Sequence, residues 1–138
     1  EAVVGLWIDL IGYHRSLDSA YPSLPSLRET LRAETWRGLR SGHCRILLAE
    51  PTRGFAFAEI DARPSIAAVG WIHELWVEPG SRRRGVARAL VGAAEAFFEE
   101  RGGARLSVRV EELNREGLRF WERLGLSERA RILERSSA

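Results

Sequence analysis

The sequence contains no lysine, no methionine and a single cysteine, Cys44. One cysteine cannot form a disulfide within the chain, and no apolar stretch approaches the roughly 20 residues that a membrane-spanning helix requires. No secretory signal is visible either. These absences predict a cytoplasmic protein with no membrane partner. Because Glu1 is not an initiator, we expect a short N-terminal piece before it.

All the strongly basic side chains are therefore arginines, and the formal net charge is +2. Arginine suits phosphate binding because its planar fork pairs with two phosphate oxygens at once, although codon usage or a hot habitat would produce the same composition. With 138 residues and 45% hydrophobic content, the chain is long enough for one compact core and too short for two ordinary domains. The composition predicts a single α/β domain over residues 1–138.

Apolar residues recur at helical spacing in some segments and alternate in others. Helices are expected at residues 3–17, 26–40, 86–98 and 114–124. Strands are expected at residues 45–49, 55–60, 67–77, 106–110 and 126–134. Ser26 followed by Glu29 forms a capping-box pattern at the start of the second helix, and Asn114 is a favourable cap for the last one. This order of elements predicts a mixed α/β sheet rather than a regular doubly wound one.

A loop rich in arginine and glycine joins the third predicted strand to the third predicted helix, at residues 78–88. The first N–H groups of a helix have no internal partner and lie at the positive end of its dipole, so they bind anions. Gly85 removes a side chain where phosphate approaches the backbone, and Ala87 is small enough to allow a second close contact. Charge-assisted hydrogen bonds would come from Arg82, Arg83, Arg84 and Arg88. A solvated basic helix start that binds nothing is the plain alternative.

The spacing Arg82-x-x-Gly85-x-Ala87 resembles the cofactor motif R/Q-x-x-G-x-G/A of the GNAT family of N-acetyltransferases. A second family signature, N-x-x-A-x-x-x-Y-x-x-x-G-F, is similar to residues 114–126, and the two motifs lie in the family's order and separation. The resemblance implies an α/β fold with a mixed, mostly antiparallel central sheet that is flanked by helices and splayed between its fourth and fifth strands. The family's extreme N-terminal first strand is not evident in this sequence.

The resemblance also implies a reaction, in which the acetyl group of acetyl-coenzyme A moves by direct attack to the primary amine of a small-molecule or peptide acceptor, without a metal. The pantetheine arm would enter between the splayed strands, where a backbone N–H stabilises negative charge on the thioester oxygen. The cofactor-binding residues that it implies are Leu75, Trp76, Val77, Arg82, Arg83, Arg84, Gly85, Val86, Ala87, Arg88, Asn114 and Trp121.

A protonated amine must lose a proton before it attacks, so a base with a pKa near neutrality is expected beside the acceptor. His73 is the first candidate, because the family often places a His or Glu four residues before Val77 and an unperturbed histidine pKa is about 6.5. Glu74 is the second. Strand alternation sends these two side chains to opposite faces, so both reach the acceptor cleft only if a β-bulge interrupts the strand. A histidine hydrogen-bonded within the sheet is the structural alternative. Other candidates for the acceptor end are Tyr13, His14, Asp18, Tyr21, Glu59, Glu111 and Glu112.

Trp121 stands where the family has a tyrosine that protonates the departing thiolate, and an indole is not an acid. We expect Trp121 to be structural. A thiol with a pKa of about 8.5 leaves as thiolate at pH 7 at a cost of about 2 kcal/mol, so water or another hydroxyl can complete the reaction. The missing tyrosine keeps open a catalytically silent acyl-coenzyme A sensor. A nucleic-acid-binding module that grips phosphates with residues 82–88 is disfavoured, because acidic residues are scattered through the chain. The oligomeric state, a homodimer included, is open.

Overall fold

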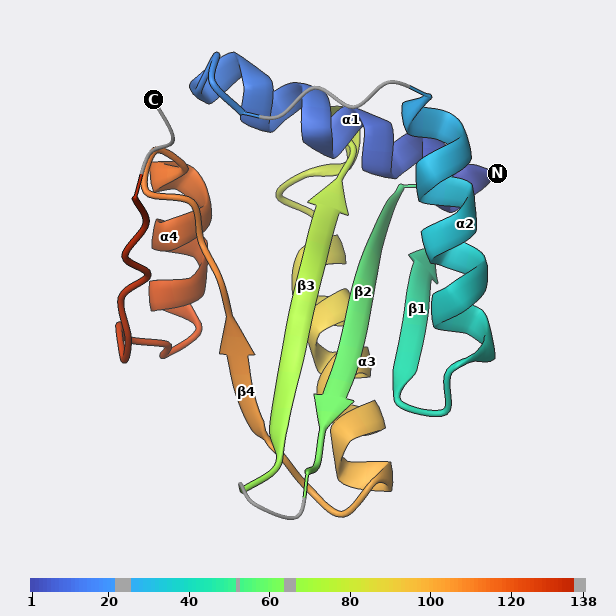
Figure 1. Ribbon diagram of the computed structural model, residues 1–138, viewed down its shortest axis with the longest axis vertical. Helices are drawn as coiled ribbons and strands as arrows, with labels where there is room; N and C mark the ends of the chain where they lie inside the picture. Colours follow the sequence, from blue (N-terminus) through green and yellow to red (C-terminus); the bar gives the residue numbers. More distant parts are fainter. Residues whose placement is uncertain (22–25, 52, 64–66, 136–138) are drawn as a thin grey trace.

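The computed structural model describes residues 1–21, 26–51, 53–63 and 67–135. Its helices are α1 (Ala2–Leu17), α2 (Leu27–Arg40), α3 (Val86–Glu100) and α4 (Arg115–Arg123), and a short 3-10 turn, η1, spans Pro79–Ser81. Its strands are β1 (Cys44–Ala49), β2 (Gly54–Asp61), β3 (Val69–Val77) and β4 (Arg105–Val108), as Figure 1 shows. The predicted order of elements is therefore confirmed as far as α4.

The strands form one sheet in the order β1-β2-β3-β4. β1, β2 and β3 are antiparallel to one another, whereas β4 lies parallel to β3. The predicted mixed, mostly antiparallel sheet is confirmed. Pairing of β3 with β4 covers only residues 69–72 and 105–108, after which the chain turns away from β3 towards α4 (Figure 1). This separation is the splay that the resemblance predicts, and it lies at the strand that precedes the predicted cofactor loop.

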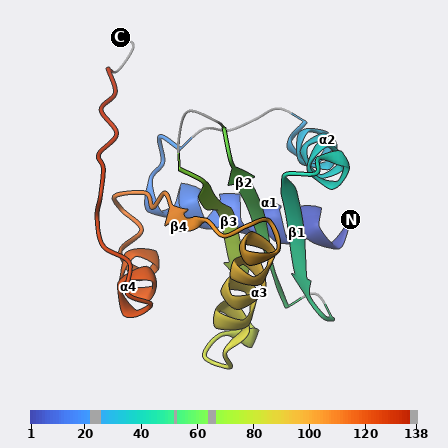
Figure 2. The same ribbon diagram turned by 90° about the horizontal axis from the view of Figure 1, so that it is seen from below.

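Helices cover both faces of the sheet (Figure 2). α3 packs on one face, where it meets Ala56 of β2 and Ile72 of β3. α1 and α2 pack on the other face, where Trp7 and Leu31 join Phe55 in a second hydrophobic cluster. Alternate residues of one strand point to opposite faces, so β2 and β3 contribute to both clusters.

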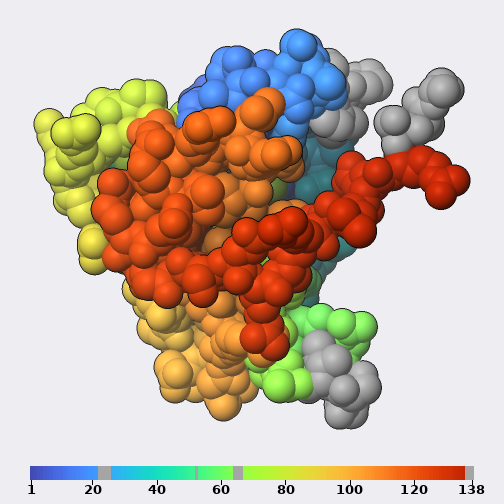
Figure 3. Space-filling view, turned by 90° about the vertical axis from the view of Figure 1, so that its left-hand side faces the viewer, coloured from blue at the N-terminus to red at the C-terminus, as the bar shows by residue number. Residues whose placement is uncertain are grey.

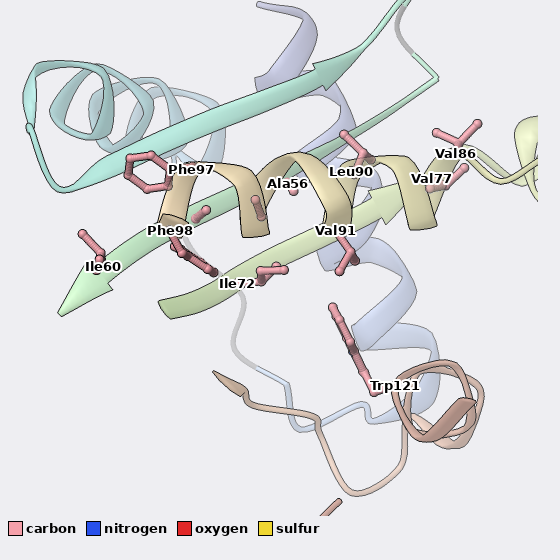
Figure 4. Close-up of a cluster of buried hydrophobic side chains, with 12 residues drawn as sticks. Ala56, Ile60, Ile72, Val77, Val86, Leu90, Val91, Phe97, Phe98 and Trp121 are labelled. Atoms are coloured by element: carbon pink, nitrogen blue, oxygen red, sulfur yellow. The ribbon is translucent and has the colours of Figure 1, made fainter. Parts of the chain in front are cut away.

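α3 forms the centre of the larger cluster (Figure 4). Its buried residues follow the spacing of three and four that the sequence shows: Val86, Leu90, Val91, Ala94, Phe97 and Phe98. The Phe98 ring lies so close to Gly70 of β3 that an added Cβ there would come within 2.5 Å of it. Only glycine permits this approach. The helix ends before Gly102 and Gly103, which both have positive φ, as expected for a C-terminal stop.

The predicted capping box at Ser26 is wrong. Ser26 has a left-handed backbone, with φ 54° and ψ 41°, and no side chain caps α2 among the described residues. A capping side chain normally needs an extended backbone to reach the helix. The cap predicted at α4 is confirmed, because Asn114 Oδ1 accepts a hydrogen bond from Gly117 N at 3.0 Å.

The strand predicted at residues 126–134 is also wrong. The described residues 126–135 form no strand, and Figure 3 shows this segment running over the outer surface of the molecule. Its apolar Ile132 and Leu133 are exposed, Leu133 to 91%. Alternation along the sequence does not suffice for a strand, because a ladder needs a neighbour and β4 does not pair with this segment.

Candidate active site

A β-bulge lies in the middle of β3, at the two residues predicted as bases. In the pairing with β2, Phe57 faces Glu74 and Ala58 faces Ile72, so His73 is an extra residue in the ladder. An extra residue resets the alternation of side chains. Glu74 therefore shares with Phe57 the face that α1 and α2 cover. The His73 ring also lies against Phe57, with ring centroids 6.2 Å apart. The β-bulge that both side chains need in order to reach the same face is therefore present.

Glu74 has a strongly shifted pKa. Burial raises this pKa from 4.5 to about 7, the charge of Glu34 on α2 adds to the increase, and a hydrogen bond from Trp7 on α1 opposes it. Burial acts in this direction because it disfavours the charged form of a carboxyl group. A carboxyl group that titrates near pH 7 can both accept and release a proton under physiological conditions.

His73 has a different environment although it is the adjacent residue. Its Nε2 lies 2.9 Å from Glu59 Oε1 of β2, and the two side chains are exposed to 43% and 42%. The imidazole stacks on Trp71, with centroids 6.1 Å apart and an angle of 12° between the planes. His73 is therefore held by its neighbours on the sheet and is partly open to solvent.

Side chains from three segments meet at the end of β3, beyond the point where β4 separates. Trp76 is buried, the Tyr13 ring of α1 lies 5.5 Å from it, and the Arg82 guanidinium lies 4.7 Å from its centroid. Arg82 Nε also donates to Val77 O at 3.0 Å, so Arg82 holds the end of the strand. Trp76 Nε1 is buried and has no hydrogen-bond partner within the described part of the chain. Such a donor is uncommon in native proteins and calls for a partner.

The predicted phosphate-binding loop presents an open helix start. Gly85, with φ 79°, is the N-cap of α3, and Arg83 also has a positive φ of 61°. No side chain of the described residues caps the first turn, and a Cβ added at Gly85 would meet nothing within 4 Å. Arg83, Arg84 and Arg88 are exposed beside it. The loop can therefore hold an anion with backbone N–H groups and guanidinium groups together.

Of the other predicted loop residues, Val86 is buried in the core and Ala87 is half-buried, so their backbone N–H groups are the parts that an anion could meet. Arg84 and Gly85 also border a groove of about 360 Å³ on the β1 side of α3, whose lining includes Arg53.

The second predicted motif connects α4 to α1. Asn114 Oδ1, which caps α4, also accepts a hydrogen bond from Tyr13 OH at 3.2 Å. Trp121 is buried in the same cluster as α3, and Figure 4 shows its side chain extending from α4 towards Val91. Asn114 therefore borders the splay, whereas Trp121 is a packing residue.

A pocket of about 190 Å³ opens between the end of α1 and the loop before α4. It is lined by His14, Leu17, Asp18, Tyr21, Glu111, Glu112, Leu113 and Asn114. The His14 and Tyr21 rings stack, with centroids 5.1 Å apart. Burial lowers the pKa of His14. Burial also raises the pKa of Tyr21, which the charges of Glu74 and Glu111 raise further. The pocket thus combines an aromatic wall with carboxylates and lies within electrostatic reach of Glu74.

Most of the residues predicted for the acceptor end line this pocket. Glu59 is elsewhere, paired with His73, and Tyr13 lies at the splay. Within the described ranges, no group of three or more potential ligands is placed to hold a metal ion. No helix among the described residues has the length and apolar character needed to cross a bilayer.

A sheet that opens beside an anion-binding helix start, with a carboxyl group of near-neutral pKa on the covered face, is the architecture expected of an acyltransferase that uses a coenzyme A thioester. The sequence pattern of the acetyltransferase (GNAT) family matches residues 13–126. The chain belongs to this family.

Individual proteins and solved structures are also similar to this chain. The mycothiol acetyltransferase of Salinispora tropica is 33% identical over 75 residues, which are 54% of this chain and 24% of that protein. This match covers about a quarter of the length of the curated relative. The aminoglycoside N-acetyltransferase AAC(6')-Iy in complex with CoA has a TM-score of 0.71 at 21% identity, over 97% of this chain and 88% of that one. A tetramutant of the BH1408 protein from Bacillus halodurans has a TM-score of 0.79 at 14% identity, over 99% and 92%. At these identities the two structures show a common fold.

These findings confirm the predicted family and fold class, and they identify the chain as an acetyltransferase domain.

Proposed function

We propose that the protein transfers the acetyl group of acetyl-coenzyme A to the primary amine of a small molecule that carries further positive charge. The observation that carries the proposal is a half-buried carboxyl group, Glu74, whose pKa is about 7 and whose charge acts on Tyr21 in a pocket lined by carboxylates. One relative of the chain is a mycothiol acetyltransferase, and one structural neighbour is an aminoglycoside N-acetyltransferase. Both names describe acetyl transfer to small molecules.

The residues at the splay fit a coenzyme A thioester. The N–H groups at the start of α3, with Arg83, Arg84 and Arg88, would hold the pyrophosphate. The strand pairing of β3 with β4 ends at Ile72. The backbone groups of residues 75–77 that do not pair with β2 are therefore left for the pantetheine arm and the thioester carbonyl, except Val77 O, which Arg82 already binds. When bound, acetyl-coenzyme A supplies the activated acyl group.

Glu74 is the base in this proposal. Alkylamines are largely protonated at neutral pH, since an ordinary ammonium group has a pKa of about 10.4. A carboxylate with a pKa of about 7 accepts this proton more readily than an ordinary glutamate with a pKa of about 4.3. His73 lies on the same face, but Glu59 already binds its Nε2. We therefore place Glu74 ahead of His73, the reverse of the order that the sequence suggests.

The pocket favours an acceptor with a second cationic group. Asp18, Glu111 and Glu112 line it, and each exposed ion pair to an ammonium group contributes up to about 1 kcal/mol. The stacked pair of His14 and Tyr21 offers a flat wall for the carbon skeleton of the acceptor. Selectivity for charge would then come from the pocket, while Glu74 activates the amine that reacts.

Two amines of equal length test this proposal. Diaminobutane and butylamine differ by one ammonium group, and acetylation of each is followed through release of the coenzyme A thiol. We expect kcat/KM to favour the diamine by tenfold or more, which corresponds to about 1.4 kcal/mol. The double variant Glu111→Gln with Glu112→Gln should bring the two values closer together, mainly through a higher KM for the diamine.

Equal values for the two amines in the wild-type protein would contradict a charged acceptor. The catalytically silent sensor remains the second candidate, because Trp121 is buried in the core and offers no acid. Binding of coenzyme A by calorimetry, without thiol release with any amine, would favour the sensor.

A further inference from the structure

A tyrosine hydroxyl lies where β3 and α4 face each other across the splay. Tyr13 OH is 3.2 Å from Asn114 Oδ1 at the start of α4, and the same ring lies 5.5 Å from Trp76 near the end of β3. Figure 1 shows α1, which carries Tyr13, crossing over this end of the gap. Tyr13 therefore contacts both sides of the space into which the thioester is proposed to bind.

The same cluster contains a donor without a partner. Trp76 is only 8% exposed, and its Nε1 donates to no atom of the described residues. A buried N–H without a partner lowers the stability of the fold, because it has lost its hydrogen bond to water. The Tyr13 hydroxyl thus lies at the gap beside the ring that carries this unpartnered donor, and hydroxyl and N–H groups suit a group that gains electron density, such as a departing sulfur.

We propose that Tyr13 donates the proton that the departing sulfur of coenzyme A takes up, an inference that rests on the acetyl transfer proposed above. α4 has only the indole of Trp121 at its buried face, and an indole does not supply a proton. The Tyr13 hydroxyl, which comes from α1, is the acid of the site.

Protons and electrons balance in this step. The nitrogen lone pair forms the new C–N bond, and the C–S bond breaks with its electron pair on sulfur. Between ammonium and amide, the nitrogen loses one proton to Glu74 and one to water, while sulfur gains one from Tyr13. Tyr13 then recovers a proton from water and Glu74 releases its own. One proton is released per acetyl group transferred.

The environment of Tyr13, burial above all, keeps its hydroxyl protonated. Burial raises the pKa of Tyr13, Glu116 on α4 raises it further, and Arg82 and Arg119 oppose the increase. At neutral pH the phenol is therefore neutral, as a proton donor must be. Loss of the hydroxyl would leave the cap of α4 in place, because Asn114 Oδ1 would still accept the hydrogen bond from Gly117 N.

A spectroscopic experiment locates the hydroxyl independently of turnover. The chain has two tyrosines, so Tyr13 is the sole one in the Tyr21→Phe protein, and fluorotyrosine there gives one fluorine NMR resonance with a more acidic phenol. The resonance is titrated with pH in complexes with coenzyme A and with desulfo-coenzyme A, which lacks the sulfur. A thiolate beside the phenol opposes its ionisation, so we expect a midpoint at least one pH unit higher with coenzyme A. Equal midpoints would overturn the proposal.

A kinetic experiment tests the proton transfer itself. Tyr13→Phe keeps the ring and removes the hydroxyl. At pH 7 a thiol of pKa about 8.5 is favoured over its thiolate by about thirtyfold, so we expect kcat to fall by roughly tenfold to thirtyfold, with a smaller loss as the pH rises. The affinity for coenzyme A should stay within about twofold. An unchanged kcat at pH 7 in a folded variant would contradict the proposal. If the wild-type protein acetylates no amine, the proposed function fails, but the NMR titration still decides whether Tyr13 lies beside the sulfur.

Discussion

On the α3 side of the sheet the buried side chains are apolar throughout, whereas on the α1 side the same strand presents Glu74 and His73 among aromatic rings. The first side fixes the helix whose start is proposed to bind the pyrophosphate. The second side carries the two candidate bases. The β-bulge at His73 turns two consecutive polar residues, His73 and Glu74, to the same face of β3. After the bulge, Leu75 and Val77 again point into the hydrophobic core on the α3 side. The apolar core and the proposed catalytic groups thus lie on opposite faces of β3.

The largest expected effect concerns the α3 side. Phe97 is fully buried, so Phe97→Ala should lower the free energy of unfolding by about 3–5 kcal/mol through lost contacts and a cavity. Leu133→Ala is the matched control, because Leu133 is exposed and should change stability by less than about 0.5 kcal/mol. Urea unfolding of the two variants checks this contrast. Similar losses in both would show that the α3 side is not the core of the protein.

The α1 side is tested by its two candidate bases. Glu74→Gln keeps the shape of the side chain and removes the base, so kcat/KM for an amine should fall by about a hundredfold or more. His73→Gln should cost less than about tenfold. In the wild-type protein the rate should increase with pH through about 7, because the carboxylate is the active form, and this increase should be absent from Glu74→Gln. The reverse ranking of the two variants would make His73 the base.

A smaller effect is expected at the loop that joins the two sides. Gly85 has φ 79°, so any other residue strains the backbone, and Gly85→Ala serves as the control for strain. Relative to that control, Gly85→Asp should weaken coenzyme A binding by about tenfold, or 1.4 kcal/mol, because it brings a carboxylate to the phosphates. Calorimetry measures both affinities. Identical values would mean that the pyrophosphate binds elsewhere.

Local patterns in the sequence were enough to predict α3 and the Asn114 cap. A helix repeats every three or four residues, and a cap acts within three residues, so both depend on neighbours along the chain. The strand predicted at residues 126–134 failed because pairing depends on a partner that the pattern does not contain. The splay between two strands could be predicted only because the sequence resembles a known family.

The contacts that define the site are long-range. Tyr13 and Asn114 are 101 positions apart, and no local spacing connects them. The bulge depends on how β2 is paired with β3, so its occurrence could not be predicted from the residues of β3 alone. The pKa of Glu74 depends on burial and on Glu34 of another helix. Both candidate bases were visible as residue types, but their ranking required the environment of each.

The most direct test of the account is the pKa of Glu74 in the folded protein. The carboxyl carbon of each glutamate is labelled with carbon-13, and the Glu74 resonance is assigned as the one absent from Glu74→Gln. Its chemical shift is then followed from pH 4 to pH 9. The account predicts a midpoint at about 7, and a midpoint near the ordinary value of about 4.3 would contradict the assignment of Glu74 as a base poised for amine acetylation.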